Sequence, residues 1–270
     1  MAQHPQPPGE LVDAGGYRVH LYCTGQGEPA VFVVGAGYSF DWILVQQEVA
    51  KFTRICTYDA SGTAWSDPGP PLTCSARVEE LHEIMPNGPK ILVGLSIGGL
   101  VERLLAKRYP DGIAGIVIVD HAFLDVAPDK APPFAGRADL DSPPVLLSAP
   151  SIDLTVEETS NFRNLPNESQ ALHRWADSLH PKLATVETAE DCIAQIGDAK
   201  LGGIPLAVVS TANDNPNYPK LQKQLLALST YSRQFIADKS FHSIEIDQPG
   251  IVVEAIRLLT STVRSRITGR

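Results

Sequence analysis

The chain has 270 residues, with 22 Lys and Arg against 31 Asp and Glu, so its formal net charge is −9 at pH 7. A hydrophobic fraction of 43% is that of a globular protein rather than a disordered one, and the length fits one or two domains. The acidic balance argues against nucleic-acid and anionic-membrane partners, because both need clustered Lys and Arg. No apolar run reaches the roughly 18 residues of a membrane span, so no membrane partner is expected.

The first ten residues are polar and contain three prolines, which predicts a flexible tail over residues 1–10, and no signal peptide is recognised there. The four cysteines lack the spacing of a metal site: Cys23, Cys56, Cys74 and Cys192. We therefore expect buried free thiols, no metal and no cofactor. The remaining expectation is a cytoplasmic protein, either a monomer or a homodimer.

Strands and helices alternate along the first half of the chain. A Gly15-Gly16 turn between segments of alternating polarity predicts an amino-terminal hairpin, over 11–13 and 17–23. Apolar runs predict four more strands, Ala30–Val34, Arg54–Tyr58, Lys90–Val93 and Gly115–Val119, separated by helices at Trp42–Phe52, Ser75–Met85 and Ile97–Tyr109. This alternation implies a mostly parallel sheet covered by helices on both faces.

The alternation stops after Asp120 and resumes about 80 residues later. The intervening segment is rich in proline, has short helical stretches at Val156–Phe162 and Glu168–Leu179, and contains no convincing strand. Strands at Ile204–Val209 and Ser232–Ile236 then follow, with helices at Lys220–Leu228 and Gly250–Val263. The sequence therefore predicts an eight-stranded α/β core, residues 11–123 and 201–270, interrupted by a mainly helical insertion, residues 124–200.

The segment Gly94–Gly99 (GLSIGG) combines the end of a predicted strand, a tight turn and the start of a helix. A serine on such a turn leaves no room for side chains two residues before and two residues after it, and Gly94 and Gly98 occupy those positions. The pattern predicts a nucleophile elbow that lifts the Ser96 hydroxyl above the sheet, beside a helix amino terminus that favours negative charge. A Gly-rich turn with an incidental serine is the alternative interpretation.

A serine hydroxyl needs an adjacent base in order to act as a nucleophile. Of the seven histidines, His242 is the best placed, in the loop between the last short strand and the carboxyl-terminal helix. His121 follows an earlier parallel strand and is the competing base. The other five lie in the tail, on a polar strand face or on predicted helices, where a solvated or capping role is expected.

An acid should orient the histidine and stabilise its charged form. We prefer Asp214, which follows the strand at 204–209, because catalytic groups gather at the carboxyl ends of parallel strands. Asp120 and Asp125, which follow an earlier strand, are the alternative acids, and Asp238 is a further one. Asp214 also has a purely structural interpretation, because Asn-Asp-Asn-Pro is ordinary turn chemistry.

An oxyanion hole requires two backbone N–H groups aimed at the developing negative oxygen. The amide of Ile97, directly after the predicted nucleophile, is the first. The second is assigned to Ala36, in the Gly35-Ala36-Gly37 segment after the strand at 30–34, with Gly37 as the alternative.

Several further segments resemble the α/β-hydrolase superfamily, in particular its proline-iminopeptidase-like and carboxylesterase-like branch. They are Gly35 with Trp42 seven residues on, Tyr58–Asp67, the elbow, Ala114–Asp120 and Phe241-His242. The order Ser96, Asp214, His242 is also the triad order of that superfamily. The resemblance covers the chain from Leu11 to the last helix, except the insertion, which would then be a helical cap over the site.

Four positions depart from the usual superfamily pattern, at Val34, Ala60, Ala64 and Leu95, where members carry histidine, arginine, glycine and a polar or aromatic residue. None of them removes a triad member. The resemblance thus implies a serine hydrolase acting on a small or medium carboxylic ester. The alternatives are an aminopeptidase, a lactonase, a C–C hydrolase, a hydroxynitrile lyase or a ligand receptor on the same fold.

Overall fold

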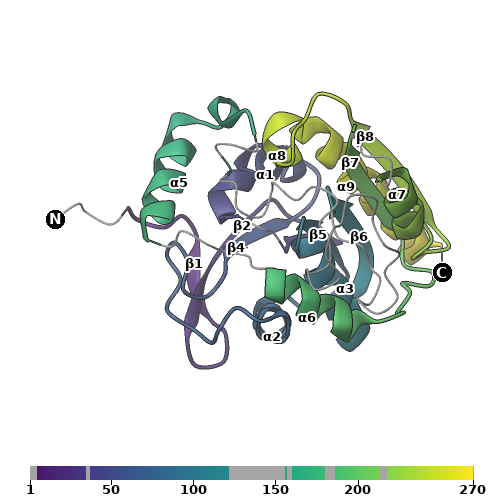
Figure 1. Ribbon diagram of the computed structural model, residues 1–270, viewed down its shortest axis with the longest axis horizontal. Coiled ribbons are helices and arrows are strands. Elements are labelled where there is room, and N and C mark those ends of the chain that lie inside the picture. The colour runs from purple at the N-terminus through teal and green to yellow at the C-terminus, as the bar shows by residue number, and fades with distance from the viewer. Residues whose placement is uncertain are drawn as a thin grey trace, which may run out of the picture.

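The computed structural model describes residues 5–34, 37–121, 156, 160–179, 186–212 and 218–269 (Figure 1). Their strands form one sheet in the order β1-β2-β4-β3-β5-β6-β7-β8. The bounds are β1 Glu10–Asp13, β2 Arg18–Thr24, β3 Ala30–Val33, β4 Ile55–Asp59, β5 Lys90–Leu95, β6 Ile113–Val119, β7 Leu206–Thr211 and β8 Ser232–Ala237. The pairs β1–β2 and β2–β4 are antiparallel and the others are parallel, which confirms the predicted architecture.

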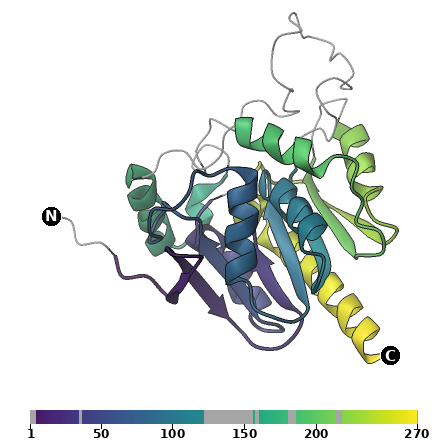
Figure 2. The ribbon, with the colours of Figure 1, turned by 90° about the horizontal axis from the view of Figure 1, so that it is seen from below.

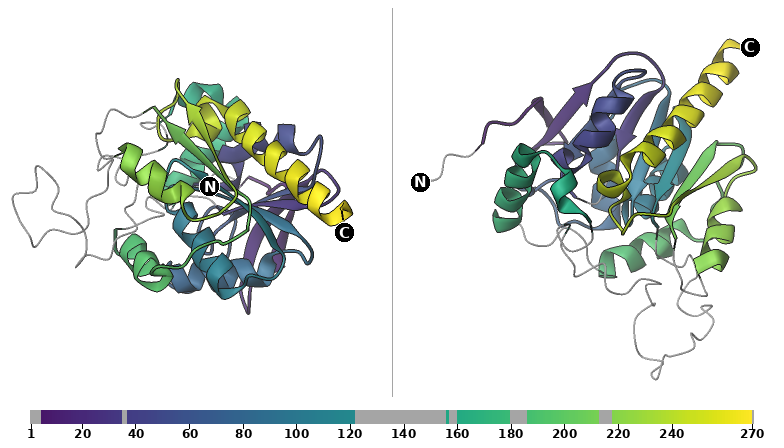
Figure 3. Two further views of the ribbon diagram at one scale, coloured as in Figure 1. Left: turned by 90° about the vertical axis from the view of Figure 1, so that its right-hand side faces the viewer. Right: turned by 90° about the horizontal axis from the view of Figure 1, so that it is seen from above.

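Helices cover both faces of this sheet. They are η1 Ser39–Trp42, α1 Ile43–Val49, α2 Cys74–Ile84, α3 Gly98–Arg108, η3 Phe162–Asn164, α5 Asn167–Leu179, α6 Val186–Ile196, α7 Tyr218–Leu226, α8 Ile244–Asp247 and α9 Pro249–Thr268. The helices α2 and α3 lie in front of the sheet in Figure 2, whereas α1 and α9 lie in front of it in the right-hand view of Figure 3. The sheet is therefore the middle of three layers.

Strand side chains alternate between two apolar cores. Ile91 and Val93 of β5 belong to the core beneath α1 and α9, while Leu92 between them belongs to the core beneath α2 and α3. All three are fully buried. Because both faces are covered, each central strand is apolar at successive positions, and this made the strands predictable to within about two residues.

The predicted insertion, residues 124–200, is described only in part: 122–155, 157–159 and 180–185 lie outside the described residues. The helix predicted at 168–179 is α5, which packs on η1, whereas no helix is predicted over the residues of α6, which packs on α2 and α3 (Figure 1). The helices α5 and α6 thus contact different parts of the core.

The segment before β1 contacts the core through two carbonyl oxygens. The indole N–H of Trp65 donates to the carbonyl oxygen of Pro5, 2.7 Å away. The His20 Nε2 atom is hydrogen-bonded to the carbonyl oxygen of Pro8. Residues 5–8, which the sequence assigned to a flexible tail, therefore lie against the first strands.

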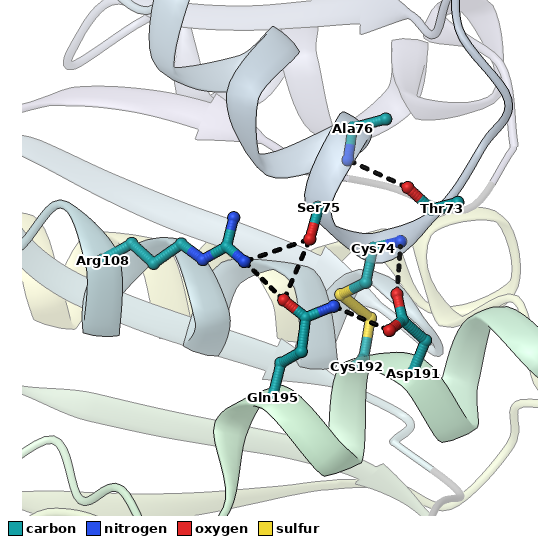
Figure 4. Close-up of a disulfide and its surroundings, with 8 residues drawn as sticks. All are labelled: Thr73, Cys74, Ser75, Ala76, Arg108, Asp191, Cys192 and Gln195. Carbon is teal, nitrogen blue, oxygen red and sulfur yellow. Dashed lines mark hydrogen bonds between the residues drawn. A yellow bond between two sulfur atoms is a disulfide. The ribbon is translucent and has the colours of Figure 1, made fainter.

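All four cysteines are paired in disulfides, so the expectation of free thiols is wrong. Cys23–Cys56 joins β2 to β4, whose antiparallel register places these two residues directly opposite each other. Cys74–Cys192 joins α2 to α6 across a sequence separation of 118 residues (Figure 4). Both pairings arise from strand register and helix packing, which no local spacing of cysteines reveals.

Polar contacts surround the second disulfide (Figure 4). The Asp191 carboxylate accepts the backbone N–H of Cys74 at 3.2 Å, at the start of α2. The Gln195 side-chain oxygen accepts the Ser75 hydroxyl at 2.9 Å and the guanidinium of Arg108. The helix α6 is therefore fixed to α2 and α3 by covalent and polar contacts together.

The two disulfides bear on the expected location of the protein. Disulfides persist mainly in oxidising compartments, which weighs against the cytoplasm predicted from the sequence. Within the part of the chain that the structure describes, no helix is long and apolar enough to cross a membrane.

We expect replacement of both Cys74 and Cys192 by serine to lower the free energy of unfolding by about 5 kcal/mol, because that bridge closes a loop of 118 residues in the unfolded chain. The matched control replaces Cys23 and Cys56, which close a loop of 33 residues. Its loss should be about 1 kcal/mol smaller by loop entropy. Urea denaturation measures both, and a larger loss for the shorter loop would contradict this explanation.

Candidate active site

Ser96 lies between β5 and α3 with a backbone φ of 54°. This left-handed conformation is uncommon for any residue other than glycine, asparagine or aspartate, and such strain concentrates at functional sites. The turn is held by two backbone hydrogen bonds, from the Ser96 N–H to the Val119 oxygen at 2.9 Å and from the Gly99 N–H to the Ser96 oxygen at 3.0 Å. The predicted tight turn is therefore present.

The glycine before the serine is required by the close approach of the backbone. A Cβ atom at Gly94 would lie 2.4 Å from the carbonyl carbon of Gly98, so no side chain fits there. Because α3 begins at Gly98, the amide of Ile97 belongs to the group of N–H donors at the helix amino terminus. Ile97 is thus placed where the sequence put the first oxyanion donor.

His242 is hydrogen-bonded to Asp120, the alternative acid of the sequence prediction. The Nδ1 atom of His242 lies 2.7 Å from Oδ2 of Asp120. The other carboxylate oxygen of Asp120 accepts the Tyr218 hydroxyl at 2.8 Å, the Thr211 hydroxyl at 3.2 Å and the Thr211 N–H at 3.4 Å. Asp120 itself follows β6 directly, with a φ of 37°.

These contacts decide the ionisation of Asp120. Burial alone would raise the pKa of this carboxyl group, since the side chain is almost inaccessible to water. The hydrogen bonds from His242, Tyr218 and Thr211 outweigh burial and hold the pKa of Asp120 below its ordinary value. In return, burial and the Asp120 charge raise the pKa of the Tyr218 hydroxyl, which therefore stays a donor.

The loop that carries His242 is fixed by residues of α8 and the turn after it. The Asp247 carboxylate accepts the N–H of Phe241 at 2.8 Å, and the Gln248 side chain accepts the N–H of Lys239 at 2.6 Å. Asp247 also accepts the N–H of Asn161, from the insertion, at 2.6 Å. The insertion thus contacts the segment that orients His242.

Three of the predicted site residues lie outside the described residues: the preferred acid Asp214, the alternative acid Asp125 and the oxyanion candidate Ala36. The remaining acid candidate, Asp238, is exposed and accepts a hydrogen bond from Gln248. His121, the competing base, is buried with its Nδ1 atom 3.2 Å from the backbone oxygen of Ser96. His242 and Asp120, both among the described candidates, form a histidine–carboxylate pair.

Two further histidine–carboxylate pairs lie on the other side of the elbow, and the sequence interpretation missed both. Nδ1 of His173, on α5, lies 2.8 Å from Asp41, and Nδ1 of His20, on β2, lies 2.7 Å from Asp59. All four side chains are buried. A capping or solvated role was expected for these histidines, and the spacing of His173 and Asp177 on one face of α5 is the only sequence signal that could have suggested otherwise.

The carboxylates of these pairs hold the backbone that follows the predicted oxyanion segment. Asp41 accepts the N–H of Tyr38 at 2.9 Å, and Asp59 accepts the N–H of Ser39 at 2.8 Å. Gly37 has a φ of 94°, and a Cβ atom there would lie 2.9 Å from the Asp41 carboxylate. This turn therefore needs a glycine next to a buried charge.

A buried glutamate, Glu245, also lies near these groups. Burial first of all, and the nearby carboxylates of Asp41, Asp247 and Asp120, raise the pKa of Glu245 well above its ordinary value. Elsewhere in the described residues, no cluster of three or more His, Cys, Asp or Glu side chains could hold a metal ion. The described groups at this edge are thus one serine, its backbone donors and three histidine–aspartate pairs.

Comparisons of the sequence identify a family and several similar proteins. The sequence profile of the family described as alpha/beta hydrolase fold matches residues 29–248. Esterase Rv0045c of Mycobacterium tuberculosis is 25% identical over 284 aligned residues, covering 96% of this chain and 91% of the esterase. An uncharacterized protein of Schizosaccharomyces pombe is 28% identical over 160 residues, and the match spans only 30% of that protein.

Solved structures share the fold at low identity. An esterase from Thermogutta terrifontis superposes with a TM-score of 0.67 at 21% identity, covering 94% of this chain and 99% of the esterase. A haloalkane dehalogenase variant from Bradyrhizobium elkanii superposes with a TM-score of 0.72 at 14% identity, covering 97% and 98%. At these identities the likeness extends to the fold alone, because one fold hosts several chemistries.

The structure makes the acid testable by paired substitutions. We expect Asp120→Asn to lower kcat about 10³–10⁴-fold, because the amide would hold His242 in the wrong tautomer without its negative charge. The matched control is Asp214→Asn, which should change kcat less than about threefold, since Asp120 already occupies Nδ1 of His242. Steady-state hydrolysis of an activated ester measures both, and the reverse order of effects would restore Asp214 as the acid.

The low pKa of Asp120 also predicts a pH dependence of stability. A carboxyl group whose pKa is lower in the folded than in the unfolded chain stabilises the fold above about pH 3.9, and this contribution is lost as the pH falls through the folded value. We expect the difference in unfolding free energy between wild type and Asp120→Asn to shrink as the pH falls below about 4 in urea titrations. Tyr218→Phe, which removes one donor to Asp120, should weaken this dependence, and a pH-independent difference would contradict it.

Proposed function

The chain belongs to the α/β-hydrolase fold family, and within that family we propose that it is a serine hydrolase that cleaves a small or medium carboxylic ester. The observation that carries the proposal is the strained Ser96 turn beside the hydrogen-bonded pair of His242 and Asp120. The esterase of Mycobacterium tuberculosis, aligned over 96% of this chain, supports the choice of an ester.

The first half of the reaction forms an acyl-enzyme. The Ser96 oxygen bonds to the acyl carbon as its proton passes to Nε2 of His242, the ring nitrogen that Asp120 leaves available. The tetrahedral oxyanion accepts hydrogen bonds from the amides of Ile97 and Ala36. The bond from the acyl carbon to the alcohol oxygen then breaks, and His242 returns the proton to that oxygen.

The second half of the reaction releases the acid. Water attacks the acyl carbon while its proton passes to His242, and the bond to the Ser96 oxygen breaks as the serine regains a proton. Asp120 stays ionised throughout, since its hydrogen bonds keep its pKa low, and it stabilises the imidazolium at each step. Neither half requires a cofactor.

The side chain on the elbow separates this proposal from other chemistries of the fold. Epoxide hydrolases and haloalkane dehalogenases use an aspartate nucleophile there, whereas this chain carries Ser96. An aminopeptidase, lactonase, C–C hydrolase or hydroxynitrile lyase would use the same triad. The triad therefore does not distinguish these enzymes from an esterase, and the shape and polarity of the substrate pocket do. A ligand receptor would keep the fold without turnover.

The test is a panel of p-nitrophenyl esters of increasing acyl length, assayed with wild type and Ser96→Ala. We expect turnover with a maximum at short or medium chains, and a loss of at least about 10³-fold in kcat for Ser96→Ala, because no other nucleophile remains. Ser178→Ala, at an exposed position of α5, is the matched control, and its kcat should equal that of the wild type.

A fluorophosphonate probe separates the remaining possibilities. Labelling that requires Ser96, with no turnover of any ester in the panel, would contradict the ester proposal and favour a triad enzyme for another bond. The absence of both labelling and turnover would favour a ligand receptor. Retained turnover in Ser96→Ala would show that the nucleophile is assigned wrongly.

A further inference from the structure

A closed cycle of polar contacts joins the helix α5 of the insertion to the turn after β3. Within it, Asp41 accepts the N–H of Tyr38 at 2.9 Å and lies 2.8 Å from Nδ1 of His173. Nε2 of His173 lies 3.4 Å from Asp177, one turn further along α5. Asp177 accepts the hydroxyl of Tyr38 at 2.9 Å, which closes the cycle.

The cycle is built around a buried ring with a carboxylate on each side. Asp41 and His173 are 1% and 2% exposed, so water does not compete for their contacts. Both ring nitrogens of His173 face carboxylate oxygens, with Asp41 at Nδ1 and Asp177 at Nε2. The hydrogen bond to the Asp41 carboxylate fixes the orientation of the ring, because hydrogen bonds to ionised groups are short and directional.

Aromatic side chains fix the plane of the same ring. The rings of Tyr38, Phe40 and Phe162 lie edge-on to it, with centroids 5.3, 6.4 and 5.1 Å away. These contacts come from the turn after β3 and from η3, so residues of both the core and the insertion pack against the ring of His173. The ring of His173 is therefore held in one orientation, unlike that of a solvated surface histidine.

The cycle restrains one of two adjacent amides, and the core restrains the other. The N–H of Ser39 is held by Asp59, which is paired with His20 of β2 inside the sheet. The N–H of Tyr38 is held by Asp41, which is paired with His173 of the insertion. In the sequence these amides follow directly on Ala36 and Gly37, the candidate oxyanion donors.

We propose that His173 is a positioning residue, through which the helix α5 of the insertion sets the oxyanion segment. The juxtaposition of His173 with Asp41, and of Asp41 with the Tyr38 amide, couples the seating of α5 to the position of the turn at residues 37–42, which follows the candidate oxyanion donors. The inference rests on the proposed serine hydrolysis for its kinetic consequence, whereas its structural consequence stands without it.

The kinetic test uses His173→Gln, whose donors both lie on one nitrogen and so cannot reach Asp41 and Asp177 from opposite sides. Loss of one oxyanion donor costs about 10²–10³-fold in kcat, so a displaced segment should cost about 10–100-fold. KM for a p-nitrophenyl ester should change less than about threefold, because the oxyanion forms only in the transition state. The control Leu172→Ala loosens α5 at a neighbouring half-buried residue without cutting the cycle, and its kcat should be close to wild type.

The structural test is amide hydrogen exchange of the same variants. We expect His173→Gln to speed exchange in a peptide spanning 37–42 while a peptide spanning β5 is unchanged, and Leu172→Ala to leave both unchanged. Unchanged exchange at 37–42 in His173→Gln, or an equal loss of kcat in both variants, would overturn the inference. Wild type without turnover on any ester would defeat the proposed function instead, and the exchange result would still decide the role of His173.

Discussion

The parallel register of β5, β6 and β7 is the constraint on which the site depends. Leu95 pairs with Val119 and Val119 pairs with Val209, so β5 and β6 end side by side, and β7 continues beside them for two more residues. The residue that follows β5 donates its N–H to the carbonyl oxygen of Val119, and the residue that follows β6 donates its N–H to the carbonyl oxygen of Val209. Because these two residues are Ser96 and Asp120, a shift of one position in either strand would separate the serine from the acid that holds His242.

The left-handed backbone at both positions follows from the same geometry. Ser96 and Asp120 have φ values of 54° and 37°, and each directly follows the end of a buried strand. The chain must turn sharply there in order to leave the sheet, and hydrogen bonds from neighbouring strands keep the strained conformation. The stability of the apolar layers on both faces thus supports two conformations that would be unfavourable in isolation.

Buried histidine–aspartate pairs are the second theme of this molecule. The carboxylates of Asp41, Asp59 and Asp120 are almost inaccessible, and each one lies within 2.8 Å of a histidine ring nitrogen. Backbone or hydroxyl donors occupy the other carboxylate oxygens, as a buried charge requires. One pair holds the base, and the other two hold the turn that follows the oxyanion segment, so similar chemistry serves both halves of the site.

The sequence by itself determined the sheet and the tight turn that carries Ser96. Parallel strands covered on both faces must be apolar at successive positions, and a tight turn after such a strand must have glycine at Gly94, so local patterns sufficed for these features. Only the tertiary structure decided that Asp120 pairs with His242, that Cys74 pairs with Cys192 and that His173 reaches Asp41. Each of these pairs joins residues that lie more than 100 positions apart, and their contact depends on strand register and helix packing, which no local pattern records.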